Sequence, residues 1–224
     1  MTAELQGVPS VTLFGGLQLP QSVVVSWILI AALILAAILL TRNLSRDHPG
    51  KRQMALEIAV GWFNNFCREN IGEKHWKSFA PWLGTVGLYI AVANLSGFVG
   101  LPSPTRDLSV TCALAVMSML LIYGAQFRYN GLLGGMKKFT EPVALLLPIN
   151  LMEIVIRPLS LCMRLFGNVM ASYIIMEMIK CLVPVLLPIP FSLYFDLFDG
   201  LIQTLVFVFL TSLFVGEAVE DEEE

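Results

Sequence analysis

One segment determines the class of protein: Arg157-Pro158-Leu159-Ser160-Leu161-Cys162-Met163-Arg164-Leu165-Phe166-Gly167-Asn168. Twelve uncharged residues, Leu165 to Met176, follow its second arginine, so the segment is typical of a membrane-embedded helix. A guanidinium cannot be neutralised by losing a proton, and holding it at bilayer depth costs from about 2.5 to more than ~10 kcal/mol. Such a residue usually faces a water-filled path or an opposing carboxylate. Ion movement is therefore the first hypothesis for Arg164, and a purely structural role is the alternative.

The composition extends this interpretation to the whole chain. Of 224 residues, 56% are hydrophobic and only 14% are charged, whereas soluble domains carry about 25% charged residues. Four uncharged runs approach or exceed the roughly 20 residues that span a bilayer: Val23–Leu40, Ser78–Thr105, Leu108–Phe127 and Gly200–Gly216. We therefore predict an all-α integral membrane protein of about five membrane-embedded helices in a single polytopic domain.

Several other functions are disfavoured by the sequence. No Lys or Arg precedes the first apolar run, which indicates a retained span rather than a secretory signal. The cysteines lack CxxC spacing and stand in apolar surroundings, so we expect small hydrophobic residues rather than a metal site or disulfides. The net charge of −3, which includes the acidic C-terminal run, gives no indication of nucleic-acid binding. No cofactor is expected.

The segments are predicted from these runs and from the loop charges. They are a first span at 22–41, an interfacial amphipathic helix at 51–72, spans at 78–100 and 108–128, long tilted helices at 143–180 and 189–218, and an acidic tail at 219–224. Basic residues gather after the first and third spans, which predicts an outside N-terminus and a cytoplasmic C-terminus. The apolar residues of 51–72 repeat at helical spacing, as in a helix lying on the membrane surface, although a linker helix packed on the protein has the same pattern.

The last third departs from simple spanning. Pro148 to about Lys180 would form a helix of about 48 Å, longer than the hydrocarbon layer of about 30 Å. The helix must therefore tilt or break, and Pro158 is the candidate kink. A turn from Val183 to Pro190 then leads into a second long helix. We predict a tilted antiparallel pair.

Polar residues form one stripe on each of these two helices. Glu153, Arg157, Arg164 and Asn168 are spaced by 4, 7 and 4 residues, and Asp196, Asp199 and Gln203 by 3 and 4. Glu153 and Arg157 can form a structural ion pair, but Arg164 has no carboxylate one turn away. With Tyr173 and Glu177, the stripes predict a chain of exchangeable groups that reaches inward from the outer side as an aqueous half-path for protons.

Each relay residue also has a structural interpretation that the sequence leaves open. Asp196 near a helix end can be a capping or snorkelling residue, and Asp199 can be structural. Tyr173 is typical of an interfacial anchor or a packing residue. Glu177 can simply pair with Lys180.

These residues resemble subunit a of the F-type ATP synthase in its bacterial form. The similarity runs through most of the chain. It rests on Asn94-Leu95-Ser96-Gly97-Phe98, Pro104-Thr105-Arg106-Asp107-Leu108-Ser109-Val110-Thr111, Ala113-Leu114-Ala115, Glu141-Pro142, Leu147 to Glu153, the Arg157–Asn168 block, and Gln203 with Phe207, Phe209, Leu210 and Thr211. The Arg157–Asn168 block is the most specific.

The resemblance implies a non-catalytic stator subunit in a bacterial inner membrane. Arg164 is then expected to face a rotating ring of c subunits, each with a membrane carboxylate, and Asn168 and Gln203 to shape the site around it. Subunit b and the other ATP synthase subunits are the further expected partners. A departure from the family concerns two relay positions. Members often have a Glu or His nine residues after the arginine and a His or carboxylate seven before the glutamine, and here these positions hold Tyr173 and Asp196. The alternatives are an ion-coupled secondary transporter and a structural membrane anchor.

Overall fold

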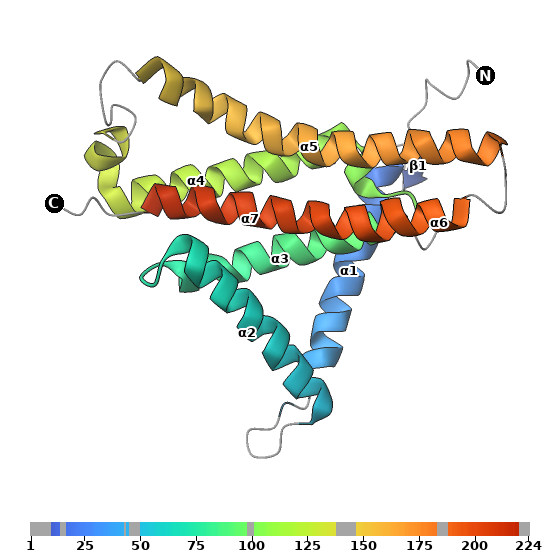
Figure 1. Ribbon diagram of the computed structural model, residues 1–224, viewed down its shortest axis with the longest axis horizontal. Helices are drawn as coiled ribbons and strands as arrows, with labels where there is room; N and C mark the ends of the chain where they lie inside the picture. The colour runs from blue at the N-terminus through green and yellow to red at the C-terminus, as the bar shows by residue number, and fades with distance from the viewer. Residues whose placement is uncertain are drawn as a thin grey trace.

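The computed structural model describes residues 10–13, 17–42, 44, 50–97, 101–137, 147–182 and 188–219. Five of its helical segments are long and apolar enough to cross a membrane (Figure 1): Gln21–Thr41, Trp76–Leu95, Leu108–Gly131, Met152–Cys181 and Pro188–Val219. The predicted all-α membrane fold with about five spans is therefore confirmed. The single-domain organisation stays a prediction.

A short β-hairpin before the first span is the one departure from the all-α prediction among the described residues. Strand β1 (Ser10–Leu13) pairs antiparallel with β2 (Leu17–Pro20), with Ser10 opposite Pro20. Helix α1 (Gln21–Thr41) begins directly after Pro20. The hairpin was missed because four-residue strands carry too little alternation to be recognised in an apolar sequence.

Four long helices form the bundle that holds the polar residues. They are α3 (Trp76–Leu95), α4 (Leu108–Lys137), α5 (Leu147–Leu182) and α7 (Gly200–Val219). Helix α4 lies beside α5 and α7, and α3 lies beside α7. The span within α4 ends at Gly131, whose φ of 70° interrupts the helical backbone. Helix α1 leaves this bundle at an angle and touches it mainly near its own N-terminus (Figure 1).

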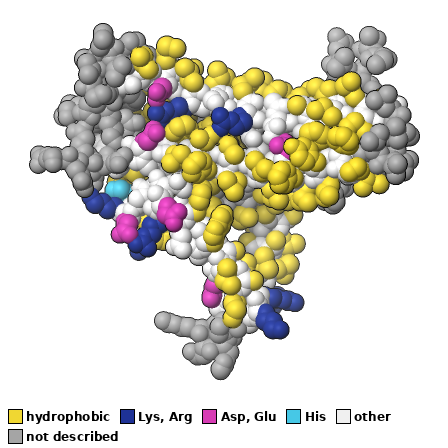
Figure 2. Space-filling view, viewed as in Figure 1, with side chains coloured by type: hydrophobic (Ala, Val, Ile, Leu, Met, Phe, Trp, Pro, Cys, Tyr) yellow, Lys and Arg dark blue, Asp and Glu magenta, His cyan; other side chains and the backbone are white. Residues whose placement is uncertain are grey.

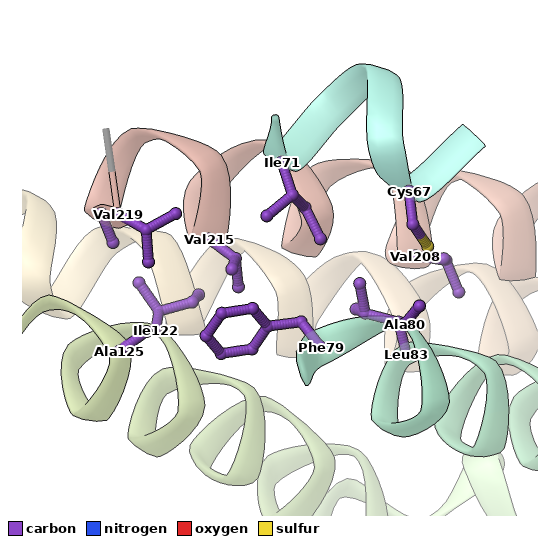
Figure 3. Packing of buried hydrophobic residues seen from close by; sticks show 11 residues of the cluster. Cys67, Ile71, Phe79, Ala80, Leu83, Ile122, Ala125, Val208, Val215 and Val219 are labelled. Atoms are coloured by element: carbon purple, nitrogen blue, oxygen red, sulfur yellow. The ribbon is translucent and has the colours of Figure 1, made fainter. Parts of the chain in front are cut away.

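The largest buried cluster joins four helices at one end of the bundle (Figure 3). Side chains of α3, α4 and α7 meet the C-terminal end of α2 (Lys51–Ile71), which contributes Cys67 and Ile71. Cys67 is fully buried, and this burial raises the pKa of its thiol to about 11. All four cysteines are free, so Cys67 packs as a small hydrophobic residue.

Helix α2 combines the two interpretations of its sequence pattern. Its Phe63 and Phe66 pack against the core cluster, as in a linker helix. Ile58 and Trp62, on the same apolar repeat, are 67% and 62% exposed. Large apolar side chains left this exposed fit the membrane interface, and we retain the interfacial position as a proposal.

The last two spans were predicted as a tilted antiparallel pair, with Pro158 as the candidate kink in the first of them. Helix α5 runs through Pro158 without a break in its 36 residues, and it changes direction along its length instead (Figure 1). The return limb begins with the short α6 (Pro188–Ser192). It continues as a π-helix, η3 (Leu193–Asp199), before α7 starts at Gly200. Of the turn predicted at 183–190, residues 183–187 lie outside the described residues and residues 188–190 belong to α6. The acidic residues 220–224 also lie outside the described residues.

The face shown in Figure 2 is largely hydrophobic along the bundle, with isolated charged side chains between the apolar ones. Many large apolar residues of α1, α4, α5 and α7 are exposed. This surface is the expected one for a chain whose helices contact lipid rather than water.

Candidate functional site

Arg164 lies on an open face of α5. Leu161, Cys162 and Leu165 are at most 3% exposed and anchor the other side of the helix in the bundle. The Arg164 side chain is therefore directed outward and is exposed. Among the described side chains it forms no hydrogen bond and no ion pair. A permanent charge in the middle of a span is thus left available to a group outside this part of the chain.

Several residues next to Arg164 on this face are small. Ser160, Gly167 and Ala171 follow the helical repeat next to it. A Cβ added at Gly167 would meet nothing within 4 Å. Small residues allow helices to approach closely in a membrane, so the face is suited to a neighbouring helix.

Asn168, one turn after Arg164, joins α5 to α7. Its Nδ2 donates to Oε1 of Gln203 at 3.4 Å. Gln203 is only 5% exposed, and its own Nε2 has no partner among the described residues. A buried amide with an unused donor usually marks a functional position or a missing water.

A cavity of about 590 Å³ extends from this amide pair to Lys180, near the end of α5, and to Pro188, at the start of α6. Its wall includes four of the predicted site residues: Asn168, Tyr173, Asp199 and Gln203. The two polar stripes of the sequence therefore meet across one cavity.

Arg106 was not predicted as a site residue, yet it lies in the same wall. It belongs to the 3-10 turn η1 (Pro104–Arg106) between α3 and α4. Its guanidinium carbon lies 4.0 Å from the centroid of the Tyr173 ring, which is a cation–π contact. No local pattern could reveal a contact between two residues this far apart in the sequence.

A buried hydrogen-bond network holds η1 and the start of α7 in place beside the cavity. Thr105 donates to Oδ1 of Asn94 at 2.8 Å, and Nδ2 of Asn94 donates to the carbonyl oxygen of Gly200 at 3.1 Å. Ser103 adds a bond to the carbonyl of Ala93. Asn94 is a polar residue within a long uncharged run, which is the signal that could have identified it.

Asp107, next to Arg106, is engaged with other groups. The Ser22 hydroxyl donates to its Oδ2 at 2.6 Å, and the Ser109 backbone N–H donates to its Oδ1 at 3.0 Å. Partial burial by itself raises the pKa of Asp107, but the hydrogen bonds from Ser22 and Ser109 outweigh it, so the pKa lies below its ordinary value. The first span is thereby tied to the segment between α3 and α4.

Two predicted relay residues are not placed in the cavity wall. Glu177 is exposed and pairs with Lys180 at 2.9 Å, the alternative that the sequence left open. Asp196 lies in the π-helix η3, and its side chain is outside the described residues. Sequence reasoning could not anticipate that Asp196 and Asp199 sit on a π-helical backbone.

The predicted ion pair of Glu153 and Arg157 is present and has a third member. Arg157 Nη2 lies 2.5 Å from Glu153 Oε2, and its Nη1 lies 2.7 Å from Oε2 of Glu217 on α7. The same guanidinium lies 4.7 Å from the Phe214 ring centroid. The cluster holds α5 against α7 on the N-terminal side of Arg164, whereas the cavity lies on its C-terminal side.

Comparison with known protein families finds a match over most of the chain. The family described as ATP synthase A chain matches residues 23–216. The matched range begins in α1, ends in α7 and includes every residue of both polar stripes.

Proposed function

This chain belongs to the ATP synthase A chain family, and on that premise we propose that it is the stator subunit that forms proton half-channels against a rotating ring of c subunits. Membership makes it a multi-pass, non-catalytic proton-channel subunit of the ATP synthase membrane sector, with other ATP synthase subunits as its partners. The ring, subunit b, a bacterial inner membrane and an outside N-terminus are the finer parts of the proposal.

The observation that carries the proposal is the exposed guanidinium of Arg164, unpaired among the described residues, on a face of small residues. A ring helix that presents a carboxylate could approach this face closely. The carboxylate is stabilised as an anion beside Arg164, so it releases its proton before it passes.

The polar cavity supplies the other half of the cycle. It leads from the C-terminal end of α5 and the start of α6 to Asn168 and Gln203, one turn from Arg164. We propose that water and Asp199 in this cavity return a proton to the ring carboxylate after it has passed the arginine. Tyr173 lines the path, and Asp196 and Glu177 remain proposed relay residues nearer its outer end.

This arrangement couples proton flow to rotation. A proton cannot cross directly, because the path is interrupted at Arg164, and it must travel on the ring instead. Each charge moved through 100 mV releases about 2.3 kcal/mol, and successive steps drive ATP synthesis.

The test is ATP-driven proton pumping by the complete reconstituted complex with Arg164→Ala. We expect pumping to be lost while the complex still assembles. Arg128→Ala is the matched control, because Arg128 is also exposed but lies near the far end of α4. Pumping at the normal rate by an assembled Arg164→Ala complex would contradict the proposal.

The outer relay is tested separately by Asp196→Asn and Asp199→Asn. Both are expected to slow proton-driven ATP synthesis in vesicles, because each removes a group that can accept and donate a proton. Unchanged synthesis would remove that carboxylate from the path.

A further inference from the structure

We propose that Arg106, held on the Tyr173 ring, is a charge filter that keeps metal cations out of the polar cavity while leaving it open to protons. This inference rests on the proposed function of the cavity as a proton half-channel. If Arg106 acts in this way, this chain contributes to the selectivity of the channel for protons over metal cations. Arg106 belongs to neither of the two polar stripes.

The first support is the position of the charge. Arg106 lies in the cavity wall, and its guanidinium is held 4.0 Å from the centroid of the Tyr173 ring. Tyr173 also lines the cavity. The ring contact leaves the positive charge in place without neutralising it.

The second support is that no nearby carboxylate of the described part of the chain is engaged with Arg106. Among the described side chains it forms no ion pair, and its neighbour Asp107 accepts hydrogen bonds from Ser22 and Ser109 instead. The backbone of η1 is fixed as well, because Thr105 is fully buried and bonded to Asn94. Arg106 is thus a fixed positive charge on a rigid turn.

The third support is the charge balance of the described wall. Arg106 and Asp199 have opposite charges, and Lys180 is already paired with Glu177. A metal cation enters the cavity only if the total electrostatic field of the wall attracts it and several oxygen atoms can coordinate it. The positive charge of Arg106 cancels the field of the Asp199 carboxylate. A proton forms a covalent O–H bond with a single carboxylate, so it is accepted where a metal cation is not.

The filter can be measured with charged thiol reagents, independently of pumping. In the full complex, the exposed Cys112 and Cys181 are replaced by serine, and the half-buried wall residue Val169 by cysteine. The rates of modification by an anionic sulfonatoethyl and a cationic trimethylammonioethyl methanethiosulfonate are then compared. Their ratio reports the sign of the potential inside the cavity.

We expect Arg106→Gln to lower the anion-to-cation ratio by about fivefold or more relative to the unaltered wall, as for one positive charge lost roughly 10 Å away in a wet cavity. Arg106→Lys keeps the charge and should restore most of the ratio. Tyr173→Leu removes the ring that holds Arg106 and should lower the ratio by less. Lys77→Gln is the matched control, since Lys77 also rests on an aromatic ring, Trp76, but lies outside the cavity wall.

An unchanged ratio in Arg106→Gln would overturn the proposal, and so would a cysteine at position 169 that neither reagent modifies. If Arg106→Gln does not assemble, Tyr173→Leu decides instead: a lowered ratio supports the proposal and an unchanged ratio overturns it. Failure of the proposed function has a different signature, namely normal pumping by Arg164→Ala. The two proposals can therefore fail separately.

Discussion

Asn168 on α5 donates a hydrogen bond to Gln203 on α7, and this bond is one helical turn from Arg164. It connects the two polar stripes at the inner end of the cavity. The amide nitrogen of Gln203, its Nε2, is buried and has no partner among the described residues. The pair therefore lies between Arg164, which has no ion pair among the described residues, and the polar cavity.

Asn168→Ala removes the remaining described partner of the Gln203 side chain. Because an unsatisfied buried polar group costs about 1–3 kcal/mol, we expect the amide to reorient and the ATP-driven pumping rate to fall about tenfold in assembled complexes. Thr204→Ala is the control, since the Thr204 hydroxyl donates to the Gly200 carbonyl within its own limb. A normal pumping rate in Asn168→Ala would show that the amide pair is not needed.

Close approaches at two glycines predict different responses to alanine. A Cβ at Gly87 would lie 2.8 Å from Cγ2 of Val208, whereas one at Gly216 would collide with the backbone carbonyl of Asn70 on α2. We expect both substitutions to destabilise the protein, by about 1–3 kcal/mol for Gly87→Ala. Val208→Ala should rescue Gly87→Ala, because it removes the side chain in conflict.

No single side-chain truncation can rescue Gly216→Ala, because its conflict is with backbone. Thermal unfolding of the detergent-solubilised chain, followed by tryptophan fluorescence, measures both effects. Equal unfolding temperatures for Gly87→Ala and Gly87→Ala/Val208→Ala would show that the contact with Val208 is unimportant.

The ion cluster around Arg157 predicts a non-additive double substitution. Glu153→Gln and Glu217→Gln each leave Arg157 with one carboxylate, and each partly exposed pair contributes only about 0.2–1 kcal/mol. The double variant leaves this half-buried guanidinium without either carboxylate. Its loss of stability should exceed the sum of the single losses, as measured by a double-mutant cycle of thermal unfolding. Strict additivity would mean that the two glutamates act independently.

The parts of the site that could be predicted from sequence are those set by a local repeat. Glu153, Arg157 and Asn168 share a face with Arg164 because a helix turns by about 100° per residue, and this pattern is visible in one sequence. The spans were predictable for a similar reason, since an uncharged apolar run of about 20 residues is typical of a helix that crosses a bilayer.

The contacts that could not be predicted from the sequence are those between residues far apart along the chain. Arg106 meets Tyr173, Asn94 meets Gly200, and Glu217 meets Arg157 through helix packing that no local period encodes. The π-helix of η3 is similar, because its residues have the same apolar pattern as an α-helical span. Pro158 was the predicted candidate for a kink, and α5 continues through it as one helix that changes direction along its length.

The hydrogen bond from Ser22 to Asp107 predicts how stability depends on pH. The pKa of Asp107 lies below its ordinary value of 3.8, because the bonds from Ser22 and Ser109 outweigh the effect of burial. A carboxyl with a depressed folded-state pKa stabilises the fold above the pKa of the unfolded chain, and this contribution is lost as the pH falls through the folded-state pKa. Ser22→Ala should therefore lower the unfolding temperature at neutral pH and have progressively less effect below about pH 4.

Unfolding scans of the solubilised chain against pH measure this difference. Ser26→Ala is the control, because Ser26 bonds to the Ser22 carbonyl and to Tyr89 but not to Asp107. A hydrogen bond to the ionised carboxylate is lost when Asp107 is protonated, whereas a packing contact is not. If the unfolding temperatures of Ser22→Ala and the unaltered chain differ by the same amount from neutral to acidic pH, the Ser22 hydroxyl acts by packing alone.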